Sequence, residues 1–195
     1  MHGRGRRGVN DVWKEQVQSV LAREDPDALL NLAGSQTGRL LRYLTGRLCS
    51  AEETEKWQAV WGLGVLVAES QLVSHEQAVD LLRRFFWTLN DESGAVPWGV
   101  PEAIGEALAV RPELREAFLP MLCSLAAEED MRQTGSIERG VLWALGRVGP
   151  AVTRCSPEAV EALRVASETH PDGETREVAA RSLASVLEPE SNRYE

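Results

Sequence analysis

Two segments far apart in the chain share one pattern of large and small residues. The segment WGLG at 61–64 and the segment WALG at 143–146 lie 82 positions apart, which is twice 41. Related segments occur at 101–110 and 175–187, and the aligned leucines, Leu63, Leu108, Leu145 and Leu183, have spacings of 45, 37 and 38. Helix pairs that recur about every forty residues bury their apolar faces by stacking on their neighbours. The chain is therefore expected to form a stack of antiparallel helix pairs.

Helix start and stop signals divide the chain into short segments. Apolar residues recur at spacings of three and four from about residue 11 to residue 187, which is typical of helices with one buried face. Ser50 with Glu53, and Ser74 with Gln77, have the spacing of a capping box, and Asp172 precedes the last helical pattern. Glycine and alanine at every third or fourth position predict that adjacent helices lie close together.

Charge is distributed unevenly along the chain. Residues 1–9 contain three arginines and no carboxylate, and we expect them to form a disordered basic tail. The remainder holds 18 cations against 30 acids, a net charge of −12. We expect one helical repeat domain over 10–188 and a polar C-terminal tail over 189–195. A body this acidic repels phosphates, which argues against a nucleic-acid partner and favours a basic protein partner.

The sequence lacks the features that are typical of several functional classes. No apolar run reaches about 18 residues, and no apolar stretch follows the basic N-terminus, so we expect a cytoplasmic protein without a membrane span. The three cysteines and three histidines are scattered, which predicts neither a disulfide framework nor a metal site. No nucleophile triad, phosphate-binding loop or dinucleotide motif is present, and we expect no cofactor and no catalytic residues.

The segment VLWALGRVGP at 141–150 resembles the second-helix signature of HEAT-like repeats, including those related to phycobilisome (PBS) lyases. The resemblance covers about residues 50–188. It implies an all-α, armadillo-type α-α superhelix of about four to five stacked antiparallel helix pairs. A further segment, 92–106, looks like one found in uncharacterised HEAT-like proteins of anaerobic bacteria, and this likeness implies no activity.

One stretch differs in composition from the helical scaffold. Residues 90–101 contain two prolines and two glycines, which forbid a regular helix, and carboxylates surround them. One interpretation is an acidic, dipole-stabilised helix start behind a tight loop. The other is a partner-binding site, because such loops on repeat scaffolds often carry function. The candidate binding residues are Trp87, Asn90, Asp91, Glu92, Trp98, Glu102 and Glu106. We also hypothesise that Trp87 and Trp98 flank one pocket.

The sequence leaves two classes of function open. The first is a non-catalytic scaffold that binds a partner protein through the concave helical surface and the 90–106 segment. The alternative is a HEAT-like enzyme, either a bilin lyase that attaches a chromophore or a DNA glycosylase. The glycosylase needs a basic groove for phosphates. It would gain support if arginines converged on one face, namely Arg39, Arg42, Arg47, Arg83, Arg84, Arg139 and Arg147.

Overall fold

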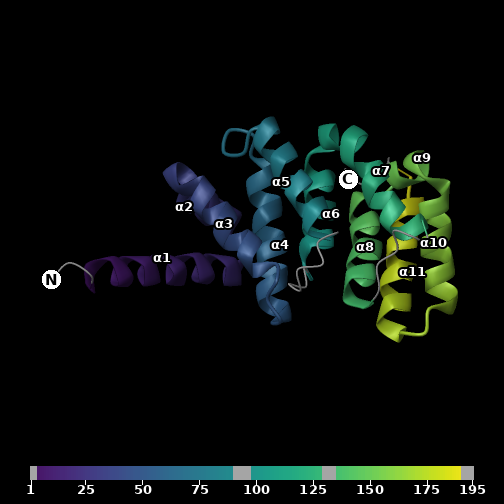
Figure 1. Ribbon diagram of the computed structural model, residues 1–195, viewed down its shortest axis with the longest axis horizontal. Helices are drawn as coiled ribbons and strands as arrows, with labels where there is room; N and C mark the ends of the chain where they lie inside the picture. The colour runs from purple at the N-terminus through teal and green to yellow at the C-terminus, as the bar shows by residue number, and fades with distance from the viewer. Residues whose placement is uncertain (1–3, 90–97, 129–134, 190–195) are drawn as a thin grey trace.

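The computed structural model describes residues 4–89, 98–128 and 135–189, with side chains from Asn10 onward. Within these ranges every regular element is a helix (Figure 1). The α-helices are α1 (Arg4–Arg23), α2 (Pro26–Ala33), α3 (Thr37–Arg47), α4 (Glu53–Ala68), α5 (His75–Leu89), α6 (Val100–Val110), α7 (Arg115–Ala127), α8 (Gly135–Val148), α9 (Ala151–Cys155), α10 (Pro157–Thr169) and α11 (Gly173–Leu187). Two short 3-10 helices, Gly34–Gln36 and Pro112–Leu114, precede α3 and α7.

The helices form two layers of a superhelix. In one layer α4, α6, α8 and α11 pack side by side in chain order. In the other layer α5 lies against α6, α7 lies against α8 and α10, and α10 lies against α11. The four aligned leucines occupy the four helices of the first layer, one on each helix: Leu63, Leu108, Leu145 and Leu183. The predicted all-α superhelix of stacked helix pairs is confirmed.

Small residues allow the helices of the first layer to approach closely. A Cβ atom on Gly105 of α6 would lie 2.6 Å from the Cα atom of Ala144 on α8. A Cβ atom on Gly146 of α8 would lie 2.5 Å from Oγ of Ser182 on α11. Real Cβ atoms do not approach other heavy atoms so closely, so a larger residue would push the helices apart. The expected close helix contacts are therefore present.

The N-terminal helix differs from its expected form. Residues 4–9, which we expected to be a disordered tail, form the first turns of α1. Adding residues to an existing helix costs little, and arginine has a high helix propensity. Further along α1, Trp13 is buried against Tyr43 of α3, and the guanidinium of Arg39 lies 3.8 Å from the indole centroid.

Two of the three predicted helix caps are present. At Ser74 the capping box is present, because Gln77 N donates to Ser74 Oγ and Ser74 N donates to Gln77 Oε1. Asp172 also caps α11 as expected. The box at Ser50 is wrong, because α4 begins at Glu53. Ser50 Oγ instead accepts from the backbone N–H of Glu52 and donates to the carboxylate of Glu55.

Candidate binding groove

Two tryptophans meet above the middle of the first layer. Trp57 on α4 and Trp143 on α8 have ring centroids 5.0 Å apart and are inclined by 62°. Helix α6 packs between α4 and α8, so the two side chains reach each other across it. Trp57 keeps 36% of its surface exposed, which leaves part of its ring available to a ligand.

Two hollows adjoin at this pair of rings. One, of about 470 Å³, is bounded by the pair together with Gly146, Arg147, Val178, Arg181, Ser182 and Ser185. The other, of about 380 Å³, is bounded by the pair together with Glu53, Lys56, Glu102, Ser136, Arg139, Glu174, Glu177, Val178 and Arg181. We call the two hollows together the groove. They adjoin because they share the rings, Val178 and Arg181, and their lining comes from α4, α6, α8 and α11.

Charged side chains of both signs line the groove, and most of them are paired. Arg147 donates through Nε and Nη2 to the two carboxylate oxygens of Glu106, at 2.8 and 3.1 Å. Such a two-point pair fixes the guanidinium plane. Arg139 lies 2.9 Å from a carboxylate oxygen of Glu174 and also contacts Asp172 at 3.4 Å.

Arg181 extends from α11 and forms no ion pair within the described part of the chain. Glu177 lies one turn before it and is exposed, as are Glu53 and Glu174. The exposed side of the groove therefore offers several carboxylates and one cation whose hydrogen-bond donors are available.

Glu102 is the most unusual ionisable residue of the groove. Only 3% of it is exposed, and its Oε1 atom lies 3.5 Å from Nζ of the buried Lys56. Its Oε2 atom is buried and has no hydrogen-bond partner. A Cβ on Gly140 would lie 2.7 Å from Oε2, so the absence of a side chain there makes room for the carboxylate. Desolvation raises the pKa of Glu102 from 4.5 to about 7, although Lys56 acts in the opposite direction.

The structure describes four of the seven residues of the predicted site. Asn90, Asp91 and Glu92 lie outside the described residues. Glu102 borders the groove and Glu106 holds one of its arginines. Neither carboxylate is an unpaired surface acid, because Glu102 pairs with Lys56 and Glu106 pairs with Arg147 of the same chain.

The two tryptophans of the predicted site occupy different surroundings. Trp98 is half-buried against the core, and the backbone N–H of the next residue, Gly99, donates to the carbonyl of Leu48. Trp87 is 69% exposed near the C-terminal end of α5, in the other layer. Among the described residues, Trp87 and Trp98 form no ring contact with each other. A pocket flanked by these two tryptophans therefore stays a hypothesis.

The arginines that would support a nucleic-acid surface are divided among α3, α5 and α8. Arg47, Arg83, Arg139 and Arg147 each form an ion pair with a carboxylate. Among the described residues, no group of three or more histidine, cysteine or acidic side chains is placed to hold a metal ion. None of the described helices is long and apolar enough to cross a membrane.

Comparisons with known proteins agree with this architecture. No family model matches the chain. An uncharacterized protein of Archaeoglobus fulgidus is 34% identical over 92 residues, which cover 47% of this chain and 48% of the relative. The match thus spans about half the length of that relative. Among solved structures, a designed armadillo repeat protein in complex with the peptide (KR)4 is similar, with a TM-score of 0.55 and 20% identity over 90% of this chain and 76% of that chain.

The fold is an armadillo-like superhelix. At 20% identity the likeness to the designed protein extends to the fold alone. Proteins built from such repeats present extended concave surfaces.

Proposed function

We propose that this protein is a non-catalytic scaffold that binds an extended segment of a partner protein in the groove. The observation that carries the proposal is the junction of the two hollows at Trp57 and Trp143. Both rings are partly exposed, and tryptophan is among the residue types that most often contribute strongly to protein–protein affinity. The paired arginine and lysine side chains around them are already held in place, so little entropy is lost when a partner binds.

We further propose that the partner segment is basic and carries at least one apolar side chain. The chain has a net charge of −9, and Glu53, Glu174 and Glu177 are exposed at the edge of the groove. The designed armadillo protein with the same fold is in complex with a peptide of lysine and arginine. Opposite charge on the two partners increases the association rate and excludes acidic competitors.

Binding of a short lysine–arginine peptide with one central leucine, measured by fluorescence anisotropy, tests the proposal. Trp57→Ala and Trp143→Ala should each weaken binding by roughly tenfold or more, because a hot-spot residue contributes about 2 kcal/mol. Trp87→Ala is the matched control, since Trp87 is an exposed tryptophan outside the groove. Thermal unfolding of each variant verifies that the fold is kept.

Two results would reject the groove as the binding site. One is affinity unchanged by both groove substitutions, and the other is no binding by the wild-type protein. A loss caused by Trp87→Ala alone would instead favour the site around residues 87–106.

The finer assignments of the sequence remain proposals. We propose that the 90–106 segment contributes to binding through Glu102 and Glu106, which border or support the groove. We also propose membership of the PBS-lyase class of HEAT-like repeats, a bacterial relationship and a cytoplasmic location. No specific observation favours the bilin-lyase alternative. The DNA-glycosylase alternative loses support because four of its seven candidate phosphate-binding arginines are paired with carboxylates.

A further inference from the structure

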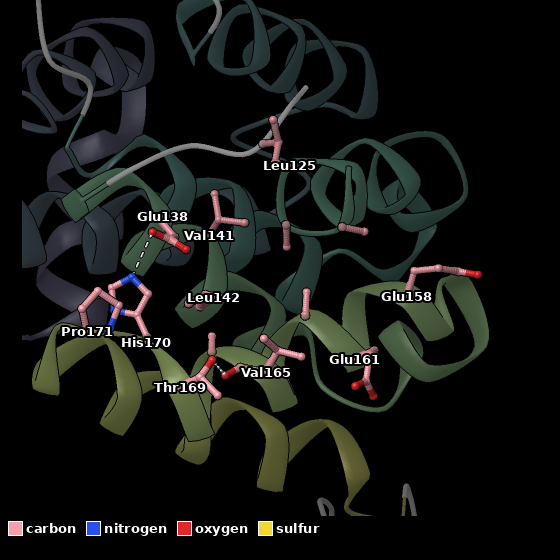
Figure 2. A pocket seen from close by; sticks show the side chains of 14 residues that line it. Leu125, Glu138, Val141, Leu142, Glu158, Glu161, Val165, Thr169, His170 and Pro171 are labelled. Atoms are coloured by element: carbon pink, nitrogen blue, oxygen red, sulfur yellow. Dashed lines mark hydrogen bonds and ion pairs between the residues drawn. The ribbon is translucent and has the colours of Figure 1, made fainter. Parts of the chain in front are cut away.

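A separate pocket of about 470 Å³ lies between α7, α8 and α10 (Figure 2). Its inner surface consists of alanine, valine and leucine side chains from all three helices. Val141 and Leu142 of α8 form buried parts of this surface, while Val165 of α10 is 49% exposed. An apolar residue exposed at the mouth of an apolar pocket is a feature of sites that receive another apolar group.

Acidic side chains surround this pocket. Glu158 and Glu161 come from α10, and Glu138 comes from α8 (Figure 2). Among the described residues of the lining, the one basic side chain is His170, and its Nε2 atom lies 3.3 Å from Glu138. Arg164, which is not part of the lining, pairs with Glu161 at 3.2 Å. Within the described part of the chain, Glu158 accepts from the hydroxyl of Ser156 and has no cationic partner. This carboxylate on the rim therefore favours an occupant with positive charge next to its apolar part.

The pocket and the groove share no lining residue. The pocket is bounded by α7, α8, α10 and the turn after α10, whereas the groove is bounded by α4, α6, α8 and α11. In that turn His170 contacts Glu138 and Asp172 contacts Arg139, so the turn is held against α8 at two points. The pocket is therefore a surface distinct from the groove.

We propose that this pocket is a second docking site, which receives two aliphatic side chains from one face of a basic amphipathic helix of a partner protein. Helices bind in this way by placing residues four positions apart into a groove between helices. The volume exceeds what one side chain needs and falls within the range of ligand pockets. The carboxylates of the rim supply the charge complementarity that selects lysine or arginine flanks.

The test uses a lysine-rich helical peptide with two leucines four positions apart, with binding measured by fluorescence anisotropy on the full-length protein. Two comparison peptides replace either both leucines by serine or the lysines by glutamate. We expect each comparison peptide to bind at least about tenfold more weakly, because burial of a leucine and charge attraction each contribute at this level.

Two protein variants locate the peptide. Val165→Arg places a cation at the mouth of the pocket and should weaken binding about tenfold. Val12→Arg is the matched control, because Val12 is an equally exposed valine on α1 (53%) and lies far from the pocket lining. Since both valines are exposed, neither change should unfold the protein.

Equal affinity of wild type and Val165→Arg would overturn the inference, as would an equal loss in Val12→Arg or no binding by the wild type. Loss of this peptide in Trp57→Ala but not in Val165→Arg would also overturn it, while leaving the groove as the binding site. Loss in Val165→Arg with unchanged binding in Trp57→Ala supports the second site independently of the proposed function.

Discussion

Replacing Glu102 by glutamine should change how the stability of the protein depends on pH. The pKa of this carboxyl is raised from 4.5 to about 7 in the folded protein, chiefly by desolvation. A group with a raised pKa binds a proton more tightly in the folded state than in the unfolded state. Its contribution to stability is therefore complete below about pH 4.5 and is lost as the pH rises to about 7.

The magnitude follows from the size of the shift. The rise of the pKa from 4.5 to about 7 corresponds to about 3 kcal/mol in the free energy of unfolding, because each tenfold change in proton affinity contributes about 1.4 kcal/mol. The carboxylate is only 3% exposed, so solvent screening reduces this value little. Glutamine has nearly the same shape but does not ionise, so the variant should lack this part of the pH dependence.

Urea denaturation followed by far-ultraviolet circular dichroism measures both proteins near pH 5 and near pH 8. Wild type should lose more stability than Glu102→Gln between the two pH values, by up to about 3 kcal/mol. Glu106→Gln is the control, since it removes a carboxylate from the same helix that pairs with Arg147 at the groove. Parallel pH profiles of wild type and Glu102→Gln would refute the argument that the buried carboxylate is poorly solvated.

Three further substitutions test the packing and the caps. Gly105→Ala should lower the free energy of unfolding by about 2 kcal/mol in urea titrations despite the better helix propensity of alanine, because α8 leaves no space for a methyl group. Unchanged stability would mean that α6 and α8 can separate without cost. Arg111→Met should cost about 2 kcal/mol in the same assay, since the buried guanidinium donates to the carbonyls of Val67 and Val73. A neutral effect would show that solvent satisfies both carbonyls. Ser74→Ala should cost about 1 kcal/mol in thermal unfolding monitored by circular dichroism, because it removes half of the capping box of α5, and a melting temperature equal to that of wild type would contradict this.

The architecture could be predicted because its signals are local and repeated. The alignment of Leu63 with Leu145 needs only the sequence, and the two residues occupy equivalent helices of one layer. Proline and aspartate at helix starts, such as Asp25 before Pro26, also act within a few residues. The Ser50 box failed because α4 begins at Glu53 with Glu52 at its N-cap, so Ser50 lies before the cap position.

The candidate site could be predicted only in part, because it depends on contacts between distant helices. Glu102 and Glu106 were found through their unusual neighbourhood in the sequence. Their burial and their pairing with Lys56 and Arg147 depend on how α6 lies between its neighbours. The groove centre was missed for the same reason, since Trp57 and Trp143 are 86 positions apart in the sequence and meet across an intervening helix.

The contact between Trp57 and Trp143 also affects how the superhelix unfolds locally. In a linear array each unit touches only its immediate neighbours, so the ends can fray while the middle stays intact. The indole pair instead connects α4 with α8, two helices that are next-but-one in the layer. Amide hydrogens in α4, α6 and α8 should therefore exchange together, as one cooperative unit, and more slowly than those of α1. The width of the groove would then be fixed before any partner arrives.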